Sequence, residues 1–201
     1  MRVGIMGGTF DPIHIGHLLI AEAAWEDLKL DKVLFMPSGN PPHKQVREGA
    51  TNSERLEITR LAIRGNPHFE LSSFEMERAE SRTYTYLTLE QLHEIHPDWD
   101  QYFILGGDSL VDFHGWKEPQ KICDACTLAV AVRNHMPADA FDAEIRALQL
   151  RYHARVEKLH TGNIDISSSE LRARIREGRS VRYFIPEASA AYIEKNRIYS
   201  C

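Results

Sequence analysis

The chain has 201 residues, of which 43% are hydrophobic and 26% charged, and its formal net charge at pH 7 is −5. These ordinary globular values argue against a disordered chain, a collagen-like chain and a coiled coil. The mildly acidic balance argues against a nucleic-acid partner, which needs a broad basic field, but it leaves room for a small basic pocket that binds a phosphorylated ligand.

Three cysteines are too few, and odd in number, for a disulfide framework. Cys123 and Cys126 form one C-x-x-C pair, but a zinc site needs two more ligands and no second pair follows. We therefore expect no protein-bound metal and ordinary thiols in a reducing cytoplasm. No signal-peptide pattern opens the sequence and no apolar run approaches about 18 residues, so we expect a cytoplasmic protein without a membrane partner.

Short apolar runs alternate with helical patterns along the chain. Residues 2–6 and 32–36 have strand length and enclose a helical pattern, which predicts a βαβ unit. Thr51-x-x-Glu54 is a capping box that opens the next predicted helix. The later predicted elements are a strand at 69–72, a helix at 85–95, strands at 102–105 and 127–132, and helices at 144–152, 171–177 and 187–196.

This alternation predicts an α/β fold with a Rossmann-like doubly wound parallel sheet, helices on both faces and a small C-terminal helical region. The expected organisation is a single domain over residues 1–201, with the C-terminal helical part at about 167–201. In such sheets ligands bind beyond the carboxyl ends of the strands, so functional residues should follow strands. Residues 37–49 form one long irregular loop, of a length that is usually functional or disordered.

The first predicted strand runs directly into the sequence GGTFDPIHIGH at residues 7–17 and then into a helix. Adjacent glycines let the backbone approach a ligand, and a helix N-terminus offers N–H donors and a positive dipole end. His14 and His17 are three residues apart and are able to face the same side of the first turn. These features suit a polyphosphate, whereas the plainer interpretation is a tight turn with Asp11 as a cap and two surface histidines.

This run resembles the signature of the nucleotidylyltransferase superfamily, whose H-x-G-H element is shared with class I aminoacyl-tRNA synthetases. Within the superfamily, the chain resembles the bacterial nicotinate-nucleotide adenylyltransferases from the first strand to the C-terminal helix. The resemblance implies ATP contacts in the first motif at Gly7, Gly8, Thr9, Phe10, His14, Gly16 and His17.

Two loop segments carry the resemblance on the acceptor side. The run NPPHK at residues 40–44 resembles a family loop whose basic residues approach substrate phosphates, here His43 and Lys44, although a solvated loop fits the residue types equally well. The run RTYT at 82–85 resembles the family segment that lies against the nicotinate ring, which implies substrate contacts at Thr83, Tyr84 and Thr85. Thr83 or Thr85 is also a candidate for a plain helix N-cap.

The run LGGD at residues 105–108 resembles the family's Gly-x-Asp, which implies nucleotide contacts at Gly106 and Asp108, with the carboxylate on ribose hydroxyls. Trp116 matches the family's tryptophan that stacks on the pyridine ring, although a lone tryptophan is more often part of the core. Arg133, at the end of a predicted strand, is a further substrate contact near the acceptor.

The run ISSSELR at residues 166–172 resembles the family's second phosphate motif. Ser168 and Ser169 stand at a predicted helix start and Arg172 follows one turn later, so hydroxyls, helix amides and a guanidinium are available to clamp a polyphosphate. The run RYFIP at 182–186 resembles the family segment near the adenine, which implies an ATP contact at Ile185.

The resemblance implies adenylyl transfer from ATP to nicotinate mononucleotide, with nicotinate adenine dinucleotide and pyrophosphate as products, in NAD biosynthesis. The expected mechanism is direct in-line attack without a covalent intermediate. His14, His17 and Arg172 are the expected catalytic residues, because they stabilise charge on the triphosphate. Magnesium is expected to arrive on the ATP phosphates, because the sequence shows no dedicated carboxylate cage.

Three other functions compete with this interpretation. Phosphopantetheine adenylyltransferases share the phosphate motifs but are typically shorter and lack the combination of residues 83–85 with Trp116. A non-catalytic ATP sensor would be expected to lose a phosphate-neutralising residue, yet both histidines and the arginine are present. An aminoacyl-tRNA synthetase fits poorly because the chain is short, acidic and without a Lys-Met-Ser-Lys-Ser loop. The sequence leaves open a homo-oligomer, the preference between nicotinate and nicotinamide mononucleotide, and closure of the 37–49 loop.

Overall fold

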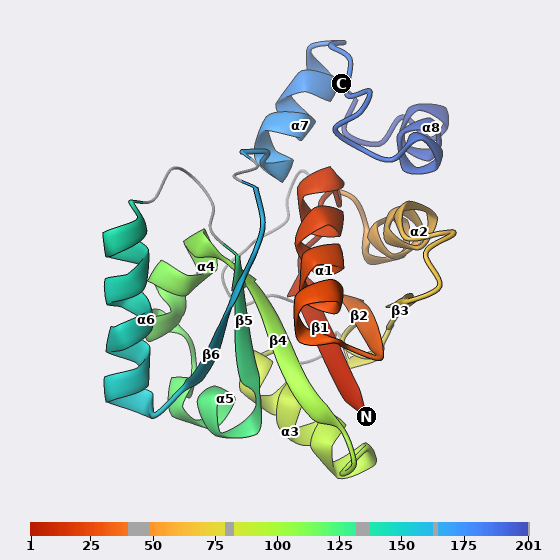
Figure 1. The fold of residues 1–201 in the computed structure, drawn as a ribbon. Helices are drawn as coiled ribbons and strands as arrows, with labels where there is room; N and C mark the ends of the chain where they lie inside the picture. The colour runs from red at the N-terminus through yellow and green to blue at the C-terminus, as the bar shows by residue number, and fades with distance from the viewer. Residues whose placement is uncertain (40–48, 79–82, 132–136, 163–164, 201) are drawn as a thin grey trace. The chain divides into compact units, whose positions relative to one another are not determined.

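The computed structural model describes residues 1–39, 49–78, 83–131, 137–162 and 165–200. In these residues six strands form one sheet in the order β3-β2-β1-β4-β5-β6 (Figure 1). The pairs β1–β4, β4–β5 and β5–β6 are parallel. The strands are β1 Arg2–Gly8, β2 Lys32–Pro37, β3 Phe69–Leu71, β4 Asp100–Gly106, β5 Thr127–Ala131 and β6 Arg155–Leu159.

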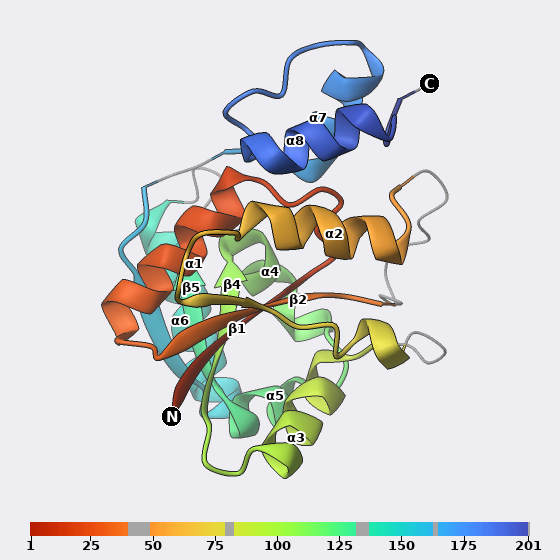
Figure 2. The same ribbon diagram turned by 90° about the vertical axis from the view of Figure 1, so that its right-hand side faces the viewer.

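Helices occupy both faces of this sheet, since α1 lies on the opposite side from α3 and α5 (Figure 2). The predicted Rossmann-like doubly wound fold is therefore confirmed. The α-helices in the described residues are α1 Ile15–Leu28, α2 Asn52–Ala62, α3 Thr85–Ile95, α4 Gly107–Asp112, α5 Pro119–Ala125, α6 Ala138–Tyr152, α7 Ser168–Arg176 and α8 Glu187–Lys195. Two short 3₁₀ helices are η1 Met76–Arg78 and η2 Phe113–Gly115. No helix in these ranges combines the length and apolar character needed to cross a membrane.

The chain divides into two compact units. The first unit comprises Met1–Gly7, Leu19–Leu34 and Tyr84–Asp165, and the second unit comprises Gly8–Leu18, Phe35–Thr83 and Ile166–Cys201. Each unit is assembled from segments that are distant in the sequence. The second unit contains the turn after β1, helix α2 and the C-terminal helices, and the first contains β4, β5, β6 and the helices that join them.

The first unit has its core along β4 and β5. All five residues of β5 are buried, as expected for a parallel strand that is covered on both faces. Helices α3, α5 and α6 pack together, and α4 packs against β4 and β5. Phe113, Ile122 and Leu128 are fully buried there. These contacts hold α4, the helix that directly follows the carboxyl end of β4, against the sheet.

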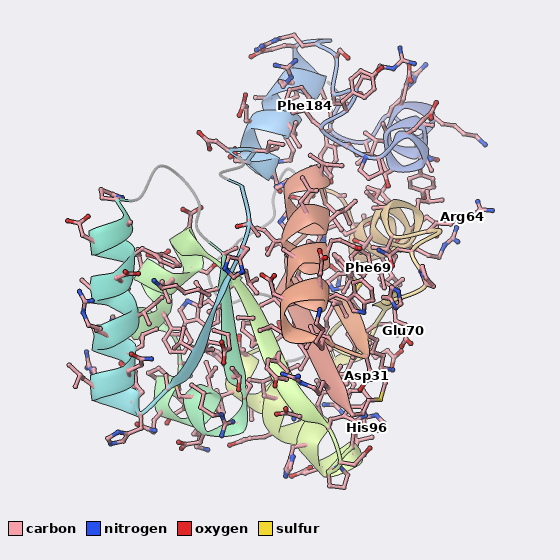
Figure 3. The ribbon with its side chains drawn as sticks, viewed as in Figure 1. Asp31, Arg64, Phe69, Glu70, His96 and Phe184 are labelled. Carbon is pink, nitrogen blue, oxygen red and sulfur yellow. The ribbon has the colours of Figure 1, made fainter. Side chains whose placement is uncertain are left out.

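The second unit is held together by helix packing and by a small aromatic cluster. Helices α2 and α8 lie side by side (Figure 2), and the Ser189 hydroxyl on α8 donates a 2.8 Å hydrogen bond to the carbonyl of Ile58 on α2. Phe69 on β3 is labelled in Figure 3. The Phe35 ring lies 4.9 Å from the Phe69 ring and 6.0 Å from the Phe10 ring. These contacts connect β2 and β3 to the turn after β1.

Local sequence signals predicted most elements well. The predicted helix at 85–95 coincides with α3, and the Thr51–Glu54 capping box is confirmed, with the Thr51 hydroxyl accepting from the Glu54 N–H. Strand β6 was not predicted, because three of its five residues are charged and solvent-exposed, so it lacks the apolar run of a buried strand. Helix α4 was also not predicted, because it spans only six residues and begins at a glycine.

Candidate active site

The chain turns sharply between β1 and α1. Phe10 is buried and has a left-handed backbone, with φ of 47°. A Cβ atom on Gly8 would stand 3.1 Å from the Phe10 ring, so the turn favours glycine at that position. Helix α1 then begins at Ile15, whose N–H donates a 2.8 Å hydrogen bond to the carbonyl of Phe184. The C-terminal region therefore contacts the N-terminus of α1 directly.

The two histidines of the first motif lie against each other in this turn. Their ring centroids are 3.8 Å apart, and the His14 N–H donates a 3.2 Å hydrogen bond to His17 Nδ1. Because Nδ1 accepts this bond, the neutral His17 ring carries its proton on Nε2, which makes that nitrogen a donor. The edge of the Phe10 ring packs 5.1 Å from the His17 ring. His14 is buried, so the interpretation of two surface histidines is wrong for that residue.

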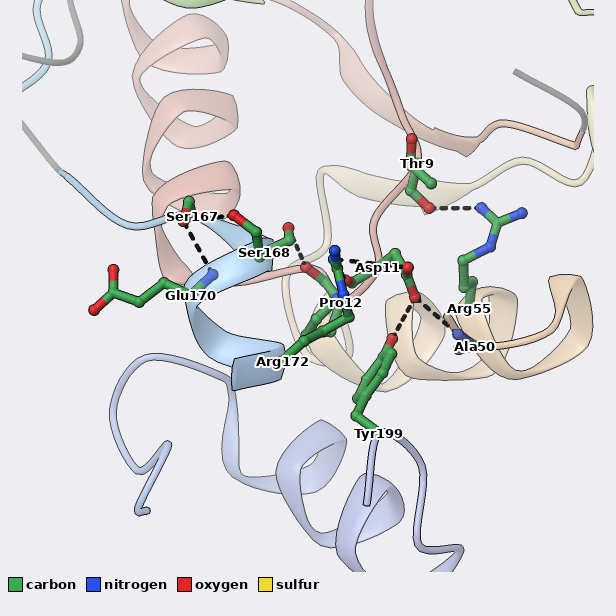
Figure 4. Close-up of polar contacts among 11 residues, drawn as sticks. Thr9, Asp11, Pro12, Ala50, Arg55, Ser167, Ser168, Glu170, Arg172 and Tyr199 are labelled. Atoms are coloured by element: carbon green, nitrogen blue, oxygen red, sulfur yellow. Dashed lines mark hydrogen bonds and ion pairs between the residues drawn. The ribbon is translucent and has the colours of Figure 1, made fainter. Parts of the chain in front are cut away.

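Asp11 does not serve as the helix cap that the plainer interpretation assigned to it. Its buried carboxylate accepts hydrogen bonds at Oδ1 from the Ala50 N–H, at 3.0 Å, and from the Tyr199 hydroxyl, at 2.7 Å (Figure 4). Its Oδ2 lies 3.7 Å from Arg172 Nη1. Asp11 thus connects three segments of the second unit.

The second motif lies against the first motif. Ser167 caps α7 by accepting from the Glu170 N–H, and the Ser168 hydroxyl donates a 2.9 Å hydrogen bond to the carbonyl of Pro12. Arg172 Nη1 donates a 2.6 Å hydrogen bond to the carbonyl of Asp11 (Figure 4). Residues more than 150 positions apart in the sequence are therefore adjacent at the turn before α1.

The guanidinium of Arg172 is held through one of its nitrogens. Nη1 contacts the carbonyl and the carboxylate of Asp11, whereas Nη2 and Nε have no protein partner within the described ranges. The side chain is 26% exposed. A guanidinium that is fixed at one nitrogen and open at two others is suited to bind an anion with two parallel hydrogen bonds.

Arg55 was not recognised in the sequence, yet it is a central residue of this cluster. Its guanidinium is buried and donates to the carbonyls of Thr9, at 2.5 Å, and Ser38, at 2.7 Å, and to Asn52 Oδ1, at 2.6 Å. Burial lowers the pKa of Arg55, and this effect is opposed by the negative charge of Asp11. The only local signal is an arginine directly after a capping box, a position that an exposed residue also commonly occupies.

The first unit contains a second group of the predicted residues. Asp108 lies in the first turn of α4, directly after β4, and Gly106 is the N-cap. The Trp116 ring is partly exposed and packs 5.4 Å from the Phe113 ring and 6.1 Å from the Phe103 ring, so it is neither fully buried nor isolated. Gly7, the next-to-last residue of β1, also belongs to this unit.

The predicted N-cap role for Thr83 or Thr85 is wrong. The N-cap of α3 is Tyr84, which has extended backbone and makes no side-chain cap bond, and Thr85 is already the first helical residue. The Thr83 hydroxyl is buried and has no hydrogen-bond partner among the described residues. His43, Lys44 and Arg133 lie outside the described residues.

The remaining predicted residues are in the second unit. Ser169 is exposed on the first turn of α7, and its hydroxyl lies 3.1 Å from that of Ser167. Ile185 is buried and its N–H donates to the carbonyl of Val181. Gly16 lies in the first turn of α1, one residue before His17.

The described ranges contain no group of three or more histidine, cysteine or acidic side chains that is able to hold a metal ion. Cys123 and Cys126 are buried and not joined by a disulfide. Burial raises the pKa of the Cys123 thiol to about 11 and that of the Cys126 thiol to about 12. Both therefore remain protonated near neutral pH, which argues against a thiolate metal ligand or a reactive cysteine.

Comparison with known proteins gives consistent results. The family model described as cytidylyltransferase-like matches residues 5–174. A probable nicotinate-nucleotide adenylyltransferase of Lachnoclostridium phytofermentans is 42% identical over 198 residues, covering 98% of each chain. A protein of the same description from Thermoanaerobacter sp. is 39% identical over 200 residues, covering 99% of this chain and 94% of the relative.

The fold also resembles solved structures. Nicotinic acid mononucleotide adenylyltransferase of Plasmodium falciparum complexed with NaAD has a TM-score of 0.81 at 20% identity, covering 98% of this chain and 97% of that chain. The same protein complexed with APC has a TM-score of 0.79 at 19% identity, covering 98% and 96%. At these identities the likeness establishes the shared fold.

Proposed function

This chain belongs to the cytidylyltransferase-like family and, within it, to the nicotinate-nucleotide adenylyltransferases, and we propose that it transfers the adenylyl group of ATP to nicotinate mononucleotide. The products are nicotinate adenine dinucleotide and pyrophosphate, which makes the reaction a step in NAD biosynthesis. The observation that carries the proposal is the contact of Ser168 and Arg172 with the turn that holds His14 and His17.

Charge neutralisation is the main catalytic requirement, because both substrates are anions. One pair of unit charges about 4 Å apart repels by about 4 kcal/mol at an effective dielectric constant near 20, and several such pairs accumulate as the substrates meet. A phosphate monoester is already a competent nucleophile near pH 7. The reaction therefore needs donors and alignment and does not need a general base or a covalent intermediate.

The second unit supplies the donors. We assign His17 Nε2–H and the two open guanidinium nitrogens of Arg172 to the oxygens of the triphosphate, where negative charge grows as pyrophosphate leaves. Ser168 and Ser169 stand at the N-terminus of α7, where backbone N–H groups add to the binding of an anion. Buried His14 orients the His17 ring through its backbone N–H, and we assign it to the same nucleotide as a further contact.

Further nucleotide contacts are proposed from the sequence motifs. Asp108 follows β4 and is suited to accept hydrogen bonds from ribose hydroxyls, as acidic residues do in dinucleotide-binding folds. Backbone contacts to ATP are assigned to Gly7, Gly8, Thr9, Phe10, Gly16, Gly106 and Ile185.

The nicotinate mononucleotide site rests on the family resemblance together with the aromatic residues of the first unit. Trp116 presents a partly exposed indole backed by two phenylalanine rings, which suits stacking on a pyridine ring. Further acceptor contacts are assigned to Thr83, Tyr84, Thr85, His43, Lys44 and Arg133.

Members of this family generally use Mg²⁺ together with ATP. The Asp11 carboxylate contacts Arg172, one of the proposed phosphate donors, but its oxygens are occupied by Ala50, Tyr199 and Arg172, so it does not fit a protein-held magnesium ion. We therefore propose that magnesium is bound by the ATP phosphates themselves. When bound there, the ion offsets part of the phosphate charge.

The test is pyrophosphate release from ATP with a panel of phosphorylated acceptors. Release with nicotinate mononucleotide, and slower release with its amide, would support the proposal. Release with phosphopantetheine alone would reassign the chain to a related transferase. ATP binding in calorimetry, without pyrophosphate release from any acceptor, would favour an ATP sensor instead.

A further inference from the structure

Tyr199, near the C-terminus, contacts the first motif although 188 positions separate it from Asp11. Its ring is buried, and its hydroxyl donates a 2.7 Å hydrogen bond to Asp11 Oδ1. After α8, the N–H of Arg197 donates to the carbonyl of Glu194 and that of Ile198 to the carbonyl of Ile193. These bonds hold the short segment that carries Tyr199, whose own backbone is left-handed with φ of 66°.

The orientation of the Asp11 carboxylate depends on such donors. The terminal torsion of an aspartate is broad, so sterics alone do not select one orientation. At Oδ1 the donors are the Ala50 N–H and the Tyr199 hydroxyl, and this places Oδ2 3.7 Å from Arg172 Nη1. The Asp11 carbonyl binds the same Nη1 at 2.6 Å. The main chain fixes the carbonyl contact, whereas the carboxylate contact at 3.7 Å depends on the donors at Oδ1 and so contributes to the direction of the guanidinium.

We propose that Tyr199 is a positioning residue for adenylyl transfer, whose hydroxyl orients the Asp11 carboxylate and through it the guanidinium of Arg172. The inference rests on the proposed function of this site. Burial and the nearby Asp11 charge raise the pKa of Tyr199 above its ordinary value, so the hydroxyl keeps its proton and remains a donor across the physiological range.

The variant Tyr199→Phe isolates this role, because it removes the hydroxyl and keeps the ring that fills the core. We expect kcat to fall about 10-fold, while the KM for the mononucleotide stays within about twofold, because the loss misdirects a charge-stabilising group. The matched control is Tyr192→Phe on α8, which removes a hydroxyl that makes no hydrogen bond to the described part of the chain. Its kcat should equal that of the wild type.

A second measurement separates positioning from a general structural effect. If Tyr199 acts through Arg172, then adding Tyr199→Phe to Arg172→Ala should cause no further loss of kcat. If adding Tyr199→Phe to Arg172→Ala lowers kcat by a further factor of about 10, the two residues act independently and the inference is overturned. A wild-type kcat in Tyr199→Phe alone would also overturn it. Asp11→Asn offers a second route, because it removes the charge toward Arg172 and should lower kcat to a similar extent without adding to Tyr199→Phe.

The same variants remain informative if the proposed function fails. If wild-type enzyme releases no pyrophosphate with any acceptor, the reaction is wrong and ATP affinity becomes the readout. Tyr199→Phe should then weaken ATP binding severalfold in calorimetry only when Arg172 is present. Equal affinity of wild type and Tyr199→Phe would overturn the positioning role independently of the reaction.

Discussion

Burial decides how much each of two arginines on α2 contributes to stability. Arg55 is buried and bonds two backbone carbonyls and an amide oxygen, whereas the Arg60 side chain is 52% exposed and bonds the Glu57 carboxylate at 2.7 and 2.6 Å. The variant Arg55→Met keeps an apolar stem but leaves the carbonyls of Thr9 and Ser38 without this donor.

A buried carbonyl left unsatisfied costs about 1–3 kcal/mol, and because Thr9 and Ser38 are only half-buried, the expected loss in the free energy of unfolding is about 2 kcal/mol for the two together. With a urea m-value of about 2 kcal/mol per molar, the unfolding midpoint should fall by about 1 M. Arg60→Met is the matched control, and its midpoint should stay close to that of the wild type because exposed ion pairs contribute little. Urea titrations followed by circular dichroism measure both. Equal shifts for the two variants would refute the reasoning from burial.

Three further predictions concern the site and the thiols. His17→Ala should lower kcat by about 10²–10³-fold with an unchanged circular dichroism spectrum, and near-normal turnover would reject its phosphate role. Trp116→Ala should raise the KM for nicotinate mononucleotide more than the KM for ATP in initial-rate assays, and equal increases would contradict the stacking assignment. Above the ordinary thiol pKa of 9.0 the unfolded chain loses thiol protons that folded Cys123 and Cys126 keep, since their pKa values are about 11 and 12. Urea midpoints should therefore fall between about pH 9 and pH 11, less steeply when both cysteines are alanine, and identical slopes would contradict this origin.

Several features of the candidate site could be predicted because they are local. Helix α3 follows from apolar spacing within 11 residues, and the capping box of α2 follows from two side chains three positions apart. The glycines and histidines of residues 7–17 follow directly after β1, where a Rossmann-like sheet places its ligands. In each case the residues that interact are neighbours in the sequence, so their spacing is enough to predict the local structure.

The buried side chains that hold the first motif, Arg55 and Tyr199, could not be predicted in this way. Arg55 occupies a position on a helix where an exposed arginine is equally common, and Tyr199 stands in a short segment after the last helix, where no periodic pattern applies. Only packing buries these side chains, and burial is what makes their hydrogen bonds to Thr9 and Asp11 strong. The amino-acid sequence by itself determined five of the six strands, most helices and the chemical character of the two phosphate motifs. The tertiary structure alone decided which buried donors orient them, because those contacts join residues 46 and 188 positions apart.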